Sequence, residues 1–138
     1  MTNFYKDKVI IVTGASSGIG LASVRNFASL GAKVVLAARS IDKLEKITEE
    51  LGQQSTVNGQ QFLCIKTDVT KEEDCKNLIE KTIERFGKID ILVNNAGIIK
   101  RIPMHEMAAE EFRQVVDIDL VAPYICAKAV LPGMMEKK

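Results

Sequence analysis

A short glycine-rich segment near the amino terminus restricts the fold of this chain more than any other feature. The letters TGASSGIG, at residues 13–20, directly follow an apolar run at residues 8–12. Leu21, Val24 and Ala28 come next, with the spacing of one face of a helix. A strand that leads through glycines into a helix brings backbone N–H groups and the positive end of the helix dipole close to a ligand, which suits a phosphate group. The segment therefore predicts a nucleotide site, and the alternative is a tight strand–helix turn without a ligand.

Apolar, strand-like segments alternate with helical patterns along the rest of the chain. The expected strands are residues 8–13, 33–38, 62–66 and 89–94. The expected helices are residues 18–30, 41–51, 71–86 and 108–132, and a polar loop is expected at residues 53–61. Ser40 and Thr70 stand where helices can be capped, and Gly52 stands just past the end of a helix.

This alternation of strands and helices predicts a parallel sheet with right-handed crossovers. The expected fold class is a doubly wound α/β sheet of Rossmann type with strand order 3-2-1-4, in one domain over residues 1–138. The order reverses between the first and fourth strands, and doubly wound folds bind ligands in the crevice at such a point. The letters NNAG, at residues 94–97, end the fourth strand, so we expect them to meet the glycine-rich segment in this crevice.

Composition excludes several other classes of protein. The chain has 138 residues, 46% of them hydrophobic, and a net charge of +1, which indicates no nucleic-acid partner. Its three cysteines, Cys64, Cys75 and Cys126, form neither a disulfide framework nor a zinc-site pattern, so no metal is expected. The apolar runs are too short to cross a membrane. We therefore expect a cytoplasmic protein in a reducing compartment.

Three motifs in combination resemble the classical short-chain dehydrogenase/reductase family. TGASSGIG at residues 13–20, Asp68-Val69 and NNAG at residues 94–97 stand in the order of that family, and FGKIDILV at residues 86–93 precedes the last motif. The resemblance extends over essentially the whole chain. It implies the N-terminal, cofactor-binding part of an oxidoreductase that interconverts a carbonyl and an alcohol by hydride transfer with a nicotinamide dinucleotide.

The resemblance also assigns cofactor contacts to individual residues. Those expected beside the phosphates and ribose are Gly14, Ser16, Ser17, Gly18, Ile19 and Gly20. Asp68 and the amide of Val69 are expected at the adenine, and Asn95, Ala96 and Gly97 beside the adenine-side ribose. The alternative for Asp68 is a turn-forming or helix-capping residue. Asn94 and Asn95 can also serve only to tie neighbouring strand ends together, and for Asn94 this structural role is favoured.

Arg39 favours one of the two nicotinamide dinucleotides. In enzymes that prefer NAD, an acidic residue at the end of the second strand holds the ribose diol. Here Ala38 takes that position and Arg39 follows it. A guanidinium matches a 2′-phosphate, so the pattern favours NADP (NADPH) over NAD unless Arg39 is only a solvated surface residue. Ser40 either adds a hydroxyl contact or only caps its helix.

The catalytic groups that the resemblance implies are a serine, a tyrosine and a lysine, with an asparagine in the long helix. Tyr124 and Lys128 have the spacing Tyr-xxx-Lys, but they follow Gly97 too closely and no serine precedes them at the family's interval. We interpret them as an aromatic packing residue and a helix-end lysine. Asp119 stands where the family has asparagine, and an ionised carboxylate only accepts hydrogen bonds. We therefore expect a fragment that lacks the catalytic residues and is inactive alone.

Two functions remain open from the sequence. The first is the cofactor-binding part of an NADP-preferring oxidoreductase, whose substrate would be a small carbonyl or alcohol of unidentified type. The alternative is a non-catalytic nucleotide-binding or heterodimerising module. The family uses the long helix, here residues 108–132, in its subunit interface, so we expect self-association through it. Residues 91–93 are also expected to form an open sheet edge.

Overall fold

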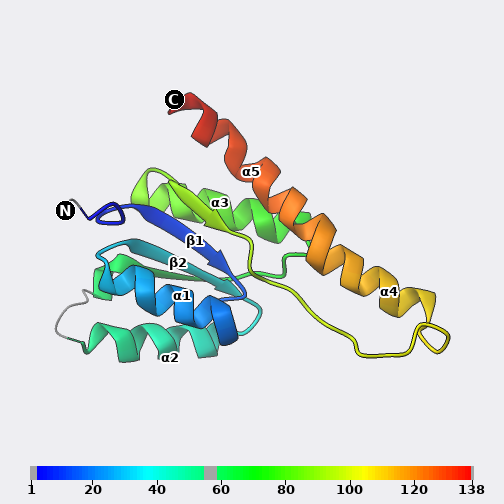
Figure 1. Cartoon of the computed structure of the whole chain (residues 1–138). Coiled ribbons are helices and arrows are strands. Elements are labelled where there is room, and N and C mark those ends of the chain that lie inside the picture. The colour runs from blue at the N-terminus through cyan, green and yellow to red at the C-terminus, as the bar shows by residue number, and fades with distance from the viewer. Residues whose placement is uncertain (1–2, 55–58, 138) are drawn as a thin grey trace.

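One parallel sheet organises the computed structural model, which describes residues 3–54 and 59–137 (Figure 1). Its strands lie in the order β3-β2-β1-β4 and pair in parallel throughout. The strands are β1 (Val9–Thr13), β2 (Lys33–Ala38), β3 (Phe62–Lys66) and β4 (Ile91–Val93). The predicted Rossmann-type order 3-2-1-4 is therefore confirmed.

The central strand β1 is bonded on both sides. Ile11 lies opposite Val35 of β2 and Leu92 of β4. Every residue of β1 is buried, because helices cover both faces of the sheet, and this explains the continuous apolar run in the sequence. β4 is shorter than the predicted strand at residues 89–94. At its start, the Val9 N–H donates to the side-chain carboxylate of Asp90 at 2.8 Å, so this contact does not extend the backbone pairing of the strand.

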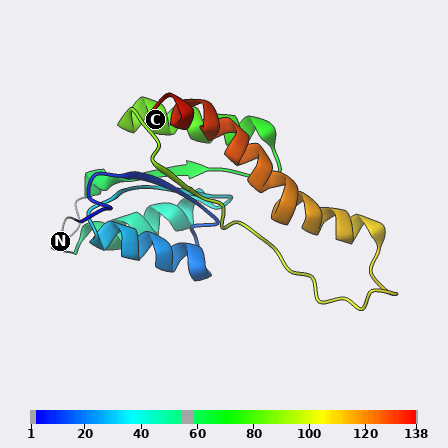
Figure 2. The same cartoon turned by 45° about the horizontal axis from the view of Figure 1, so that its top comes forward.

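Helices cover the two faces of the sheet (Figure 2). Helices α1 (Gly18–Ser29) and α2 (Ile41–Gly52) lie on one face, where Val24, Ala28 and Leu44 are fully buried. Helices α3 (Glu72–Phe86) and α5 (Ala122–Glu136) lie on the other face, where Leu78 and Val130 join the core. The sheet therefore separates two hydrophobic clusters.

The ends of α2 and α3 differ from the predicted ones by about a residue. Ser40 stands at the N-cap of α2 without a side-chain capping bond, and Gly52 is its last residue rather than the one after it. Residues 59–61 of the predicted polar loop form a 3₁₀ turn, η1 (Gly59–Gln61), whereas residues 55–58 lie outside the described residues. The predicted cap at Thr70 is wrong, because the Thr70 hydroxyl bonds to Asp68 and α3 begins one residue later, after Lys71.

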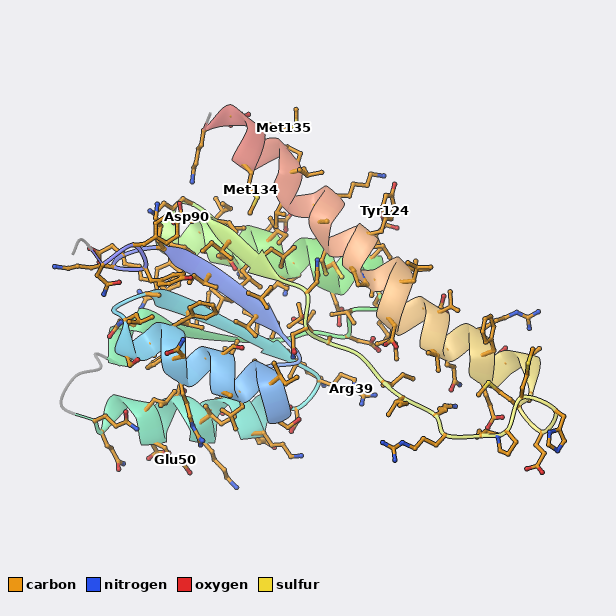
Figure 3. All side chains as sticks on the ribbon, in the orientation of Figure 1. Arg39, Glu50, Asp90, Tyr124, Met134 and Met135 are labelled. Atoms are coloured by element: carbon orange, nitrogen blue, oxygen red, sulfur yellow. The ribbon has the colours of Figure 1, made fainter. Side chains whose placement is uncertain are left out.

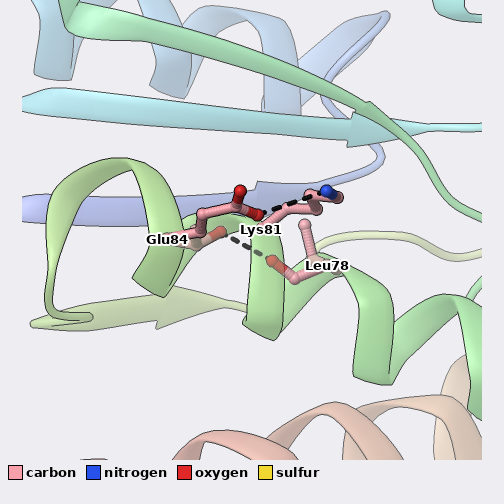
Figure 4. A network of polar contacts seen from close by, with 4 residues as sticks. Leu78, Lys81 and Glu84 are labelled. Carbon is pink, nitrogen blue, oxygen red and sulfur yellow. Dashed lines mark hydrogen bonds and ion pairs between the residues drawn. The ribbon is translucent and has the colours of Figure 1, made fainter.

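Figure 4 shows two polar contacts in the second half of α3, which has a buried side and a solvated side. On the buried side, the Thr82 hydroxyl donates to the Leu78 carbonyl at 2.7 Å, so this buried polar group is satisfied within the helix. On the solvated side, Lys81 and Glu84 form an ion pair at 3.2 Å. Gly87 ends the helix in the left-handed conformation, with φ of 76°.

The predicted long helix is one continuous element with a change of winding. It comprises α4 (Ala109–Val116), a π-helical turn η2 (Asp117–Val121) and α5. Pro123 lies in the first turn of α5, where its missing N–H is tolerated, and the helix continues past Pro132 to Glu136 rather than ending there. α4 and the loop before it extend away from the sheet (Figure 1). Among the described helices, none is long and apolar enough to span a membrane.

Candidate cofactor site

A cleft of about 740 Å³ opens at the carboxyl ends of the strands. It lies where the strand order reverses, as the fold class predicts. Most of the predicted cofactor residues line it: Gly14, Ser16, Ser17, Arg39, Ser40, Asp68, Val69, Asn95, Ala96 and Gly97. Gly18, Ile19 and Gly20 are not among its lining residues.

Thr13 and Asn95 fasten the two sequence motifs to each other. The Asn95 side-chain amide donates to the carbonyls of Thr13 at 3.1 Å and of Gly14 at 3.2 Å. The Thr13 hydroxyl accepts the N–H groups of Asn95 and Ala96, each at 3.0 Å. Thr13 is buried, so its hydroxyl has a structural role. This role was not predicted from the sequence. The position of Thr13 as the last residue of β1, directly before the first glycine, is the signal that could have indicated it.

Two glycines allow this close packing. A Cβ atom on Gly14 would lie 2.9 Å from the Ala96 Cα, and Gly14 has a φ of +61°. A Cβ atom on Gly20 would collide with the Gly14 carbonyl and lie 2.5 Å from the Asn95 amide nitrogen. Gly20 therefore acts inside the fold, as a contact between α1 and the two loops, which explains why it does not line the cleft.

The amino terminus of α1 faces the cleft through Ser16 and Ser17. Ser17 is the N-cap residue, but its side chain makes no capping bond, and the first turn holds no acidic residue. The Ile19 side chain is 79% exposed and does not close the approach. An uncapped helix start of this kind carries unopposed N–H groups and a partial positive charge, which an anion can use.

Basic side chains gather at the β2 and β3 side of the cleft. Arg39 follows β2 directly, and Lys43 and Lys66 line the same rim with two carboxylates, Asp42 and Asp68. Arg39 is exposed and forms no ion pair with the residues that the structure describes. Figure 3 shows the Arg39 side chain just beyond the carboxyl ends of the strands.

Asp68 forms the turn that leads from β3 into α3. Its Oδ1 accepts the Thr70 N–H at 3.0 Å and the Thr70 hydroxyl at 2.6 Å. The Thr70 hydroxyl, with smaller contributions from Lys71 and Arg39, holds the pKa of Asp68 below its ordinary value despite partial burial. The turn-forming alternative for Asp68 is therefore observed, and the charged carboxylate still faces the cleft rim.

Asp119 holds the loop on the opposite side of the cleft. Its Oδ1 accepts the Ile98 N–H at 2.9 Å and would lie 3.1 Å from a Cβ atom on Gly97. The neighbouring Ile118 lines the cleft. An acceptor at this position is thus bonded to the loop backbone, a contact that the sequence did not indicate.

Comparison with known proteins agrees with this geometry. Residues 8–138 match the family model described as short chain dehydrogenase. The chain belongs to the short-chain dehydrogenase family. An uncharacterized oxidoreductase of Listeria monocytogenes is 45% identical to it over 133 residues, which cover 96% of this chain and 52% of the relative. The chain spans about half the length of the curated relatives it matches.

Solved structures of short-chain dehydrogenases share the fold. An alcohol dehydrogenase from Thermococcus sibiricus, complexed with 5-hydroxy-NADP, superposes with a TM-score of 0.87 at 37% identity, over 95% of this chain and 55% of that one. A 3-ketoacyl-(acyl-carrier-protein) reductase from Brucella melitensis, complexed with NADH, gives a TM-score of 0.87 at 34% identity, over 96% of this chain and 52% of that one. The resemblance inferred from the motifs is therefore confirmed.

Tyr124 and Lys128 do not reach the cleft of this short-chain dehydrogenase chain. Tyr124 is 63% exposed, and Figure 3 shows it on the side of α5 that faces away from the sheet. The Lys128 Nζ lies 6.0 Å from the centre of the Tyr124 ring. The interpretation of Tyr124 as a packing residue is wrong, and Lys128 lies in the middle of α5 rather than at its end. Neither residue lines the cleft.

Proposed function

We propose that the cleft binds NADP(H) in preference to NAD(H), as the cofactor-binding part of an oxidoreductase that interconverts a carbonyl and an alcohol. The observation that carries this proposal is the junction of residues 13–20 with residues 94–97, with Arg39 on the same rim. Family membership supports a dinucleotide as the ligand. Of the two solved neighbours, the alcohol dehydrogenase is complexed with 5-hydroxy-NADP and the reductase with NADH.

The lining residues fit the chemistry of a dinucleotide. Gly14, Ser16 and Ser17 offer backbone close to the pyrophosphate at the start of α1. The backbone of residues 95–97 serves the adenine-side ribose, since the Asn95 side chain is already bonded to β1. Asp68 and Val69 serve the adenine edge. A bound NADPH supplies the hydride, while this chain's residues bind and orient the cofactor.

Arg39 is the residue on which the preference depends. Its exposed guanidinium forms no ion pair with the described residues, although its charge helps to lower the pKa of Asp68, and Lys43 and Lys66 add positive charge nearby. A 2′-phosphate would pair with this group, whereas a ribose diol offers it no charge. A charge-assisted hydrogen bond contributes about 1.5–3 kcal/mol, which corresponds to about ten- to a hundredfold in affinity.

A titration of the purified chain with NADPH and NADH tests the proposal. We expect NADPH to bind about ten- to a hundredfold more tightly, and Arg39→Ala to remove the difference by weakening NADPH alone. Arg25→Ala is the matched control, because Arg25 is an exposed arginine of α1 that does not line the cleft. Equal affinities for the two dinucleotides in the unaltered chain would contradict the preference.

The chain by itself binds the cofactor without turnover in this proposal. Tyr124 and Lys128 stand outside the cleft, so neither can hand a proton to a substrate bound beside the nicotinamide. The same purified chain is therefore expected to show no ketone-dependent oxidation of NADPH. A rate that Tyr124→Phe abolishes would refute this part.

A second candidate function is supported by apolar side chains on the long helix. Five large hydrophobic residues are between 49% and 68% exposed along α4, η2 and α5: Phe112, Leu120, Tyr124, Leu131 and Met135. Such a row favours contact with another protein surface, either a second copy or a longer relative.

A further inference from the structure

Two buried cysteines face each other between α3 and α5. The Sγ atoms of Cys75 and Cys126 are 3.3 Å apart, although the residues are 51 positions apart in the sequence. Both side chains are essentially inaccessible to solvent. Cys64 is the remaining cysteine, and it lies on the other side of the sheet, against Thr48 of α2. The pair is thus separate from Cys64, and neither of its members lines the proposed cofactor cleft.

We propose that Cys75 and Cys126 form an intramolecular disulfide when hydrogen peroxide oxidises the chain, and that this bond fastens α5 to α3. A disulfide needs the two sulfur atoms at about 2.05 Å. From 3.3 Å, the two sulfur atoms have to approach by about 1.25 Å, which rotation about the two Cα–Cβ bonds can supply. No segment has to unfold, because α3 and α5 already lie against each other (Figure 2), with this pair in contact between them.

The oxidation proceeds in two balanced steps. One sulfur attacks peroxide, a sulfur–oxygen bond forms as the oxygen–oxygen bond breaks, and the departing hydroxide takes the thiol proton to give water. The second sulfur then attacks the sulfenic sulfur, and the departing hydroxide takes the second thiol proton to give another water. Two electrons pass from the thiols to the peroxide, so the products are one disulfide and two waters.

The surroundings of the pair make it selective for a small oxidant. The adjacent Cys126 thiol and burial raise the pKa of Cys75 well above its ordinary value, whereas the hydrogen bond with Cys75 lowers the pKa of Cys126, so Cys126 is the sulfur that attacks the peroxide. Burial also excludes bulky reagents from both sulfurs. Cys64 is only half-buried, so it should react first with a bulky alkylating reagent.

The crosslink would act on the two walls of the cofactor cleft. The Cys75 thiol donates to the Val69 carbonyl at 3.4 Å, and Val69 lines the cleft. A disulfide has no S–H, so this bond is lost on oxidation. On the other side, Cys126 follows η2, whose Asp119 holds Ile98. Fastening α5 therefore fixes the element that carries this second wall.

Peroxide treatment of a Cys64→Ser chain tests the proposal, because only the two facing thiols remain. We expect the intact mass to fall by two hydrogen atoms, and a proteolytic map to join the peptides of Cys75 and Cys126 within a monomer. We also expect the melting temperature to rise by about 5–10 °C and to return when a reducing agent is added. The Cys64→Ser/Cys126→Ala chain is the matched control and should form no intramolecular bond.

Several results would overturn the proposal. One is that the folded Cys64→Ser chain keeps both thiols at a peroxide concentration that fully oxidises the same chain when it is unfolded in urea. Another is a chain that gains oxygen atoms, or forms only bonds between molecules. The proteolytic map of the unaltered chain after peroxide treatment tests the pairing without depending on the folding of any variant. A disulfide in that map that includes Cys64 would contradict the pairing of Cys75 with Cys126.

Discussion

Single atoms at the junction of β1 and β4 hold the cleft in shape. The buried hydroxyl of Thr13 accepts two backbone N–H groups of the facing loop, and the Asn95 side-chain amide donates to the carbonyls of Thr13, the last residue of β1, and of Gly14. Buried polar groups are costly unless they are paired, so these four bonds fix the loop against the strand. The missing side chain of Gly20 then lets α1 approach both loops.

We predict that Gly20→Ala destabilises the chain by about 1–3 kcal/mol, because the added methyl group meets backbone and the bonded Asn95 amide. The displaced loops should also weaken NADPH binding. Gly133→Ala is the matched control: Gly133 is likewise helical, nothing lies within 4 Å of an added Cβ, and the change should stabilise by about 0.5–1 kcal/mol. Urea unfolding measures the free energy of unfolding of both variants. An unchanged free energy for Gly20→Ala would show that the two loops move aside at no cost and would contradict the prediction.

The π-helical turn is the element that brings the long helix to the cleft. It spans Asp117–Val121, between α4 and α5, and it directs the Asp119 carboxylate at the loop after β4. Such turns occur as single interruptions of α-helices and are frequent at functional sites. Pro123 follows immediately, where the change of winding leaves room for a residue without an N–H.

We predict that Asp119→Ala weakens NADPH binding about two- to tenfold, since the Ile98 N–H loses its acceptor and the loop loosens. Asp119→Asn is the matched control, because an amide oxygen can still accept that N–H. Affinities from the same titration distinguish the two variants. If Asp119→Asn weakens binding as much as Asp119→Ala, the negative charge rather than the hydrogen bond is what matters.

The molecule as a whole consists of a covered sheet and an extended arm. β3 and β4 lie at the two edges of the sheet, and the loop after β4 leads to α4 away from the body of the fold (Figure 1). The arm and α5 carry large apolar side chains that the described residues leave exposed. Burying this surface against another protein would be favourable, since a leucine side chain contributes about 1.5–3 kcal/mol on burial.

We predict that the chain self-associates in solution and that Leu120→Glu weakens the association by about tenfold or more. Light scattering after gel filtration should give a mass above 15.2 kDa for the unaltered chain and a shift toward it for the variant. Phe4→Glu is the matched control, because Phe4 is 66% exposed but lies before β1 rather than on the arm or α5. A monomeric unaltered chain would rule out this use of the helix.

Local patterns in the amino-acid sequence were enough to predict the strand order and the location of the cleft. Buried strands, helix periodicity and glycine positions depend mostly on neighbouring residues, so β2 and β3 were predicted with their observed bounds. Helix ends were less accurate. The Thr70 cap failed because Asp68 competes for its hydroxyl, and the end at Pro132 failed because the helix continues to Glu136.

Contacts between distant side chains became visible only in the folded chain. The sequence allowed that Asn95 ties strand ends together, but it did not name Thr13 as the partner. The Thr13–Asn95 bonds, the Asp119–Ile98 bond and the Cys75–Cys126 contact join residues that are 82, 21 and 51 positions apart. Each depends on the register of a strand or the rotation of a helix about its axis, and no local pattern encodes these quantities. The residues alone therefore determined the family and the location of the cleft, whereas packing determined which polar groups hold that cleft together.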